Sequence, residues 1–95
     1  MLVSFQKLPK YGTVTTDEPP TFEWLEVANV DNYRLEITRI DGVPEERIIP
    51  GLAGLTLYTM PNEEKLAAGI YQWRMVAVIG AEELSTPWSL LTIAP

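Results

Sequence analysis

The feature that most constrains the fold of this sequence is its pattern of short alternating runs of apolar and polar residues, interrupted at close intervals by proline and glycine. The 95 residues include 8 prolines and 6 glycines. Alternation is typical of strands that bury one face, and closely spaced turns are typical of a β-sandwich or barrel. We therefore expect an all-β chain, and a chain of this length can bury only one core.

The strand-like segments are separated by clear turn signals, and they lie at residues 21–25, 32–40, 47–49, 55–60, 70–79 and 88–93. Asp41-Gly42 predicts a hairpin between the second and third of these segments, because Asp-Gly favours a tight turn. Residues 2–16 are expected to add an edge strand that is interrupted by Pro9 and Gly12. Residues 62–69 are expected to form one helical turn that only connects two strands.

The alternation also predicts which side chains form the core. In each strong strand, the large apolar residues share one face and the polar residues the other. The expected core residues are Phe22, Trp24, Tyr33, Leu35, Ile37, Tyr71, Trp73, Met75 and Ala77.

Three segments carry a family resemblance through their order and spacing: PTFEW at residues 20–24, YRLEI at residues 33–37 and LAAGIYQWRMVA at residues 66–77. Together they resemble the fibronectin type III family, and the single residue between Gly69 and Tyr71 is closer to its bacterial members. The resemblance implies a single domain over residues 1–95, a seven-stranded antiparallel β-sandwich of immunoglobulin-like topology. It also implies that the hydroxyl of Tyr71 bonds back to nearby backbone as a tyrosine corner.

The residue inventory argues against catalysis. The sequence contains no cysteine and no histidine, which removes thiol nucleophiles, imidazole bases and the commonest transition-metal ligands. Neighbouring carboxylate pairs stand at residues 17–18, 45–46, 63–64 and 82–83. Adjacent residues on a strand point to opposite faces, so these pairs are expected to be solvated charge, with a weak cation site as the alternative. We expect no enzymatic activity, no cofactor and no metal.

The charge balance and the termini bear on partners and location. Seven basic and 13 acidic residues give a net charge of −6, which counts against nucleic-acid binding. We find no apolar run that could insert into a membrane and no signal-peptide pattern. These features fit a cytoplasmic protein and fit equally well a piece of a longer secreted chain. We expect a monomeric domain of an extracellular or cell-surface protein.

The expected binding surface is one pole of the sandwich, where the loops at residues 26–31, 50–54 and 80–86 are predicted to meet. The loops would place an acidic rim around a small apolar centre, made of Glu26, Asn29, Asp31, Glu82 and Glu83 around Val27, Leu52 and Ala81. Such a surface suits a basic protein partner. The alternative is that these are the solvated loops of a spacer that binds nothing. Trp88, beside Pro87, is either packed or exposed enough to touch a ligand.

Two functions follow as expectations. The first is a non-catalytic spacer or protein-interaction module of a longer protein, contacting another protein or the neighbouring domains of its parent chain. The second is a carbohydrate-binding accessory module of a polysaccharide-degrading enzyme. A row of exposed aromatic side chains would favour the second function, and the sequence offers Trp88 as one candidate.

Overall fold

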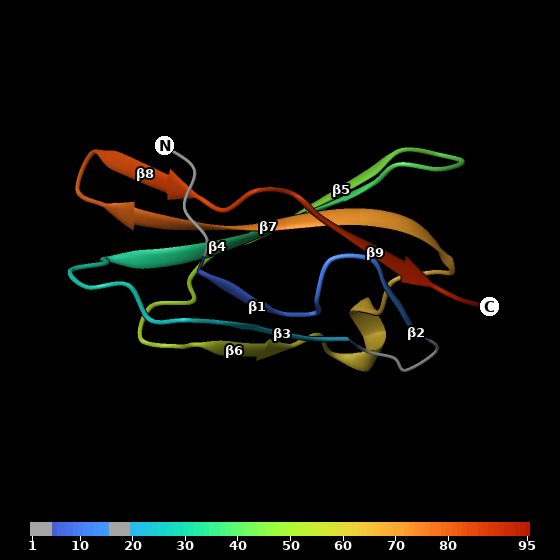
Figure 1. Cartoon of the computed structure of the whole chain (residues 1–95), viewed down its shortest axis with the longest axis horizontal. Helices are drawn as coiled ribbons and strands as arrows, with labels where there is room; N and C mark the ends of the chain where they lie inside the picture. The colour runs from blue at the N-terminus through green and yellow to red at the C-terminus, as the bar shows by residue number, and fades with distance from the viewer. Residues whose placement is uncertain (1–4, 16–19) are drawn as a thin grey trace.

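The computed structural model describes residues 5–15 and 20–95, and in these residues the chain is all-β (Figure 1). The strands are β1 (Gln6–Leu8), β2 (Thr13–Thr15), β3 (Thr21–Trp24), β4 (Asn32–Arg39), β5 (Glu45–Ile49), β6 (Leu57–Thr59), β7 (Gly69–Ile79), β8 (Glu82–Ser85) and β9 (Ser89–Ile93). One short 3₁₀ turn, η1 (Asn62–Glu64), follows β6. The all-β class predicted from the alternation is confirmed.

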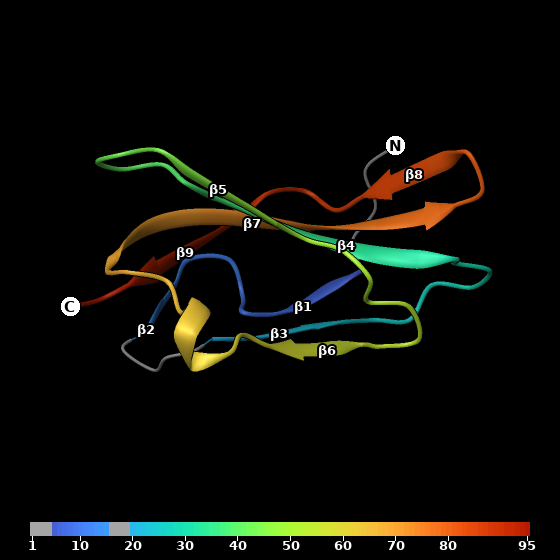
Figure 2. The ribbon, with the colours of Figure 1, turned by 180° about the vertical axis from the view of Figure 1, so that it is seen from behind.

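The strands form two sheets that lie face to face as two layers (Figures 1 and 2). The smaller sheet has the order β1-β3-β6, and the larger has the order β2-β9-β7-β4-β5 with β8 attached to β7. β4 and β5 pair antiparallel around the predicted turn, where Gly42 has a left-handed φ of 60°. The arrangement resembles a sandwich with β5 and β6 as the outermost strands on one side.

The N-terminal segment is shared between the two sheets, although a single edge strand was expected. β1 pairs antiparallel with β3, whereas β2 pairs in parallel with β9. The expectation of a wholly antiparallel sandwich is therefore wrong at β2. The chain crosses between the sheets at Pro9, which has no amide hydrogen to donate, and at Gly12, whose φ is 81°. Residues 2–4 and 16 of the expected strand lie outside the described residues.

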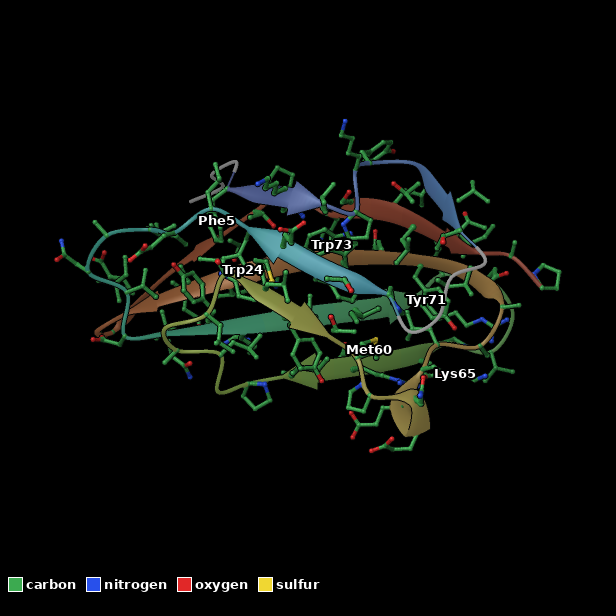
Figure 3. All side chains as sticks on the ribbon, turned by 90° about the horizontal axis from the view of Figure 1, so that it is seen from below. Phe5, Trp24, Met60, Lys65, Tyr71 and Trp73 are labelled. Carbon is green, nitrogen blue, oxygen red and sulfur yellow. The ribbon has the colours of Figure 1, made fainter. Side chains whose placement is uncertain are left out.

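All nine side chains predicted to form the core are buried. They come from β3, β4 and β7, and one cluster joins them to Phe5, Leu52, Met60, Leu66, Leu91 and Ile93. Figure 3 shows the labelled members of this cluster spread along the length of the sandwich. The face assignment succeeded because alternation along a half-buried strand directly reports which side chains face the partner sheet.

Two connections differ from their predicted form. Residues 80–86 are not a simple loop, because Gly80 and Ala81 make a two-residue turn and β8 runs back along β7. The positive φ of Gly80, 59°, suits such a hairpin turn. The helical turn is confined to η1, and the Tyr71 hydroxyl donates to the carbonyl of Ala67 at 2.7 Å just after it. That bond is the one expected of a tyrosine corner.

Candidate functional site

The three loops predicted to form a binding surface share one end of the sandwich, at the left of Figure 1. Asp31 joins two of them, because its amide donates to the Val78 carbonyl (2.8 Å) and its Oδ2 accepts from the Gly80 amide (2.7 Å). The first loop also lines a small hollow of about 120 Å³ together with residues 54–56. The role of these loops in binding stays a prediction.

The placement of Leu52 on the surface of this pole is wrong. Its side chain is only 4% exposed and belongs to the core cluster. The loop folds back because the Leu52 amide donates to the Tyr33 carbonyl (3.3 Å) and the Leu52 carbonyl accepts from the Leu55 amide (3.2 Å). Burying a leucine side chain against the open end of the core is more favourable in free energy than leaving it exposed to water.

The acidic rim is weaker than the sequence suggested. Glu26, Asn29, Asp31 and Glu82 are exposed, as expected. Glu83 is also exposed, but it accepts two hydrogen bonds from the guanidinium of Arg34, at 2.9 and 3.1 Å. These bonds lower the pKa of Glu83 below its ordinary value. Since one of the expected carboxylates is paired within the domain, less negative charge is left for a partner.

Arg34 belongs to a polar network on the outer face of the larger sheet. Its Nε donates to Glu36 Oε2 at 2.8 Å, and Arg74 Nε donates to Glu36 Oε1 at 2.7 Å. Burial raises the pKa of Glu36, but the hydrogen bonds and charges of Arg74 and Arg34 outweigh it, so this pKa lies below its ordinary value. At the end of the network, the Arg74 guanidinium lies 4.5 Å from the centre of the Trp88 ring.

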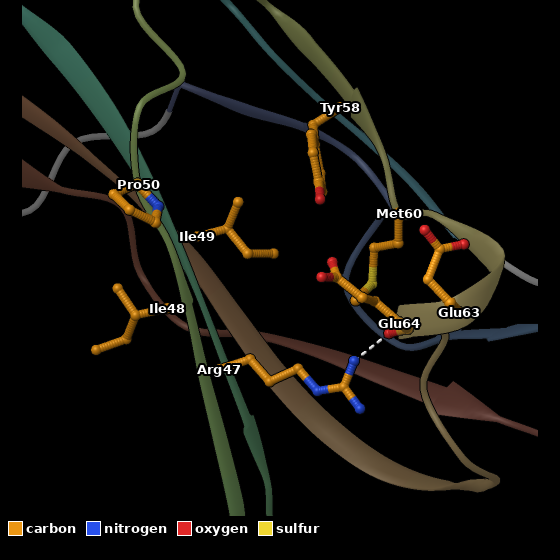
Figure 4. A pocket seen from close by; sticks show the side chains of 8 residues that line it. All are labelled: Arg47, Ile48, Ile49, Pro50, Tyr58, Met60, Glu63 and Glu64. Carbon is orange, nitrogen blue, oxygen red and sulfur yellow. Dashed lines mark hydrogen bonds between the residues drawn. The ribbon is translucent and has the colours of Figure 1, made fainter.

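A larger groove opens on the side of the sandwich between the edge strands β5 and β6 (Figure 4). It has a volume of about 500 Å³ and is lined by Arg47, Ile48, Ile49, Pro50, Tyr58, Met60, Glu63 and Glu64. We call it the β5–β6 groove. In Figure 4, Ile49, Tyr58 and Glu64 point toward one another across it. The groove combines an apolar floor with the two carboxylates of η1 at one end.

The charges in the β5–β6 groove are unevenly compensated. Arg47 is held within the domain, because it donates to the Glu45 carboxylate (2.6 Å) and to the Glu64 carbonyl. Burial, followed by the negative charge of Glu64, raises the pKa of Tyr58. The Tyr58 phenol is therefore uncharged at neutral pH. The carboxylates of Glu63 and Glu64 leave this end of the groove negative.

A second hollow, of about 350 Å³, lies where β1 approaches the start of β9. Its lining comes from the N-terminal segment and from the residues before β9, and consists of Gln6, Lys7, Pro9, Lys10, Tyr11, Pro87, Trp88 and Ser89. We call it the Tyr11–Trp88 hollow. Gln6 joins its two walls, because its Nε2 donates to the Pro87 carbonyl at 2.8 Å.

Trp88 is both packed and accessible, so both expectations for it hold in part. It stacks on Arg74 yet remains 37% exposed. The break between β8 and β9 that positions it is fixed by Thr86, which accepts from the Met75 amide (3.0 Å) and donates to the Met75 carbonyl (2.9 Å). Thr86 thus stays hydrogen-bonded to β7, whereas Pro87 and Trp88 belong to neither β8 nor β9.

Sequence reasoning missed both the β5–β6 groove and the Tyr11–Trp88 hollow. Each is built from segments that are distant in sequence, and its residues come together only once the strand order is known. Tyr11 offered one local signal, since it stands between Lys10 and Gly12 in a segment rich in turn residues. That signal predicts an exposed Tyr11 side chain, but it does not predict which residues lie beside it.

Comparisons with known proteins assign neither a family nor a function to this chain. No family model, no curated protein and no solved structure matches the chain. Residues 5–15 and 20–95 contain no group of three or more histidine, cysteine, aspartate or glutamate residues that could hold a metal ion. In the same residues no helix is long and apolar enough to cross a membrane.

Proposed function

We propose that this chain is a fibronectin type III-like domain that serves as a non-catalytic protein-interaction module of a longer extracellular or cell-surface protein. Its contact surface is the β5–β6 groove. The single observation that carries this proposal is the groove itself, an apolar floor with an acidic end between two open sheet edges. An interface needs such a buried apolar centre and a polar rim.

The strand order supports the family part of the proposal. If β1 and β2 are two halves of one first strand, and β8 and β9 two halves of one last strand, the nine strands of the described residues reduce to seven. The β1 half of the first strand then forms one sheet with the second and fifth, and the third, fourth, sixth and seventh form the other, which the β2 half joins. The interruptions fall at Pro9 to Gly12 and at Thr86 to Pro87, where the sequence explains them. The Tyr71 bond to Ala67 supports the same topology.

The open edges favour an extended partner. Within residues 5–15 and 20–95, β5 pairs only with β4, and β6 pairs only with β3. An unpaired edge presents amide and carbonyl groups that can take up an added strand, while pockets beside it select alternate side chains. The β5–β6 groove lies directly beside both edges.

The chemistry of the groove indicates what such a segment carries. Ile49, Tyr58 and Met60 offer apolar contacts, and Glu63 and Glu64 lie at one end. The net charge of −6 adds long-range attraction for cations. The partner is therefore an extended segment with apolar residues and a lysine or arginine at one end.

Selection from a library of random linear peptides, followed by affinity measurements, tests this function. Selected peptides should be rich in apolar and basic residues. The double variant Glu63→Lys/Glu64→Lys should weaken their binding by about tenfold or more. The matched control Glu26→Lys/Glu82→Lys changes the net charge equally but lies at the loop pole, and it should leave binding nearly unchanged.

Two results would contradict the proposal. If the control variant loses binding and the groove variant keeps it, the loop pole is the contact surface. If no peptide is selected, the chain is better described as a spacer between neighbouring domains.

A further inference from the structure

Two lysines stand out in the charge arrangement of the described residues. All four arginines form salt bridges with carboxylates, through Arg34, Arg39, Arg47 and Arg74. Within residues 5–15 and 20–95, neither Lys7 nor Lys10 pairs with a carboxylate. Both line the Tyr11–Trp88 hollow, and the described residues that line it include no aspartate or glutamate. An acidic domain thus leaves two uncompensated cations in one place, which favours an anionic ligand there.

The Trp88 side chain of this hollow and the backbone turn that carries Tyr11 are both held in place. The Trp88 ring rests on the Arg74 guanidinium, which the Glu36 carboxylate anchors in turn. Tyr11 is 75% exposed at the tip of a turn in which the Lys10 carbonyl accepts from the amide and the hydroxyl of Thr13, at 3.0 and 2.6 Å. The Gly12 amide then fixes this turn to the Leu90 carbonyl of β9 at 2.9 Å.

The backbone on this side is poorly suited to an added peptide strand. β1 has only three residues, its register shifts between Gln6 and Leu8, and Pro9 follows. Short edge strands, bulges, lysines and prolines all hinder strand addition. A ligand of the Tyr11–Trp88 hollow must therefore be bound through side chains, by stacking on rings and by charge.

We propose that the Tyr11–Trp88 hollow binds an acidic saccharide, a short stretch of pyranose rings that carry uronate carboxylates. The C–H faces of pyranose rings stack on aromatic faces, whose quadrupole is negative there. Lys7 and Lys10 supply the positive charge that the carboxylates require, and a volume of about 350 Å³ is within the size range of small-ligand sites. This site is separate from the β5–β6 groove and does not depend on it.

An NMR titration of the whole chain with tetrasaccharides of galacturonate, mannuronate and hyaluronan tests the proposal. At least one should bind, with shifts centred on Tyr11, Lys10 and the Trp88 indole. Binding should weaken steeply as salt rises, because the lysines are exposed and screened. A neutral tetraglucoside and a glutamate-rich peptide serve as competing probes.

Two variants and one matched control complete the experiment. Tyr11→Ala and the double variant Lys7→Gln/Lys10→Gln should each weaken binding by about tenfold, and their exposed positions allow normal folding, which thermal melts will verify. Lys65→Gln removes the remaining lysine of the chain, which lies beside η1, and should leave binding unchanged.

Several outcomes would overturn the inference. No binding by any uronate probe removes the saccharide site altogether. Equal binding of the neutral tetraglucoside removes the role of the lysines. Tighter binding of the glutamate-rich peptide assigns the hollow to an acidic protein segment instead. An equal loss in Lys65→Gln would show that net charge, not this site, governs the interaction.

Discussion

Replacing Trp73 by alanine should remove a large share of the stability of this domain. Trp73 lies in the middle of β7, its side chain is 0% exposed, and its ring meets Phe22 of β3 edge-on, with centroids 5.0 Å apart. The contact therefore joins the two sheets. Truncating a fully buried tryptophan costs about 3–5 kcal/mol, because transfer free energy is lost and a cavity remains.

That cost is large against the whole stability of the fold. A domain of this kind is stable by only about 5–15 kcal/mol, so Trp73→Ala removes roughly a fifth of that stability or more. Urea unfolding followed by circular dichroism measures the difference directly. Trp88→Ala is the matched control, since Trp88 is 37% exposed and its stacking on Arg74 is worth about 0.5–1 kcal/mol. Similar losses in both variants, or a loss under about 1 kcal/mol for Trp73→Ala, would refute the assigned packing.

Three further perturbations have defined outcomes. The pKa of Glu36 is lowered in the folded state, so its contribution to stability is present above the unfolded pKa and is lost as pH falls through the folded pKa. Urea unfolding at stepped pH should therefore show a free energy of unfolding that declines from about pH 5 downward, and Glu36→Gln should reduce that decline. Tyr71→Phe should cost about 1 kcal/mol by removing the bond to the Ala67 carbonyl, whereas Tyr11→Phe should cost almost nothing in the same assay. Leu52→Ala should lower the free energy of unfolding by about 2–5 kcal/mol, and a loss as small as that of an exposed loop residue would contradict its burial.

Much of the fold could be predicted because the strongest strands carry local information. In β4 and β7, each residue's face follows from its parity, so Leu35 and Trp73 were assigned to the core without knowledge of their neighbours. The Asp41-Gly42 turn likewise depends on two adjacent residues. These features do not depend on the order of strands in a sheet.

The errors arose where distant parts of the chain decide the outcome. A loop rich in turn residues predicts an exposed Leu52. The fold instead places Leu52 against the open end of the core, whose other residues are distant from it in sequence. β2 pairs in parallel with β9, a choice that nothing in residues 13–15 specifies. The two sites have the same origin. Tyr11 and Trp88 line one hollow, and Ile49 and Tyr58 line one groove, only because the strand order brings their segments together.

The pole of loops shows how local and distant information combine. The exposure of Glu26 and Glu82 followed from their position beside turns. The pairing of Glu83 with Arg34 did not, because it requires β8 to lie beside β7 and across from β4. The exposure of a charged side chain can be predicted from sequence, whereas its pairing with an opposite charge can be known only from the fold.

The most direct test of the proposed function is amide hydrogen exchange on the domain with and without a peptide selected for binding. Strand addition at the open edge predicts that amides of β5 or β6 become protected, with the side-chain signals of Ile49 and Tyr58 shifting at the same peptide concentrations. Protection confined to residues 26–31 and 80–82, with β5 and β6 unchanged, would contradict the assignment of the β5–β6 groove as the contact surface.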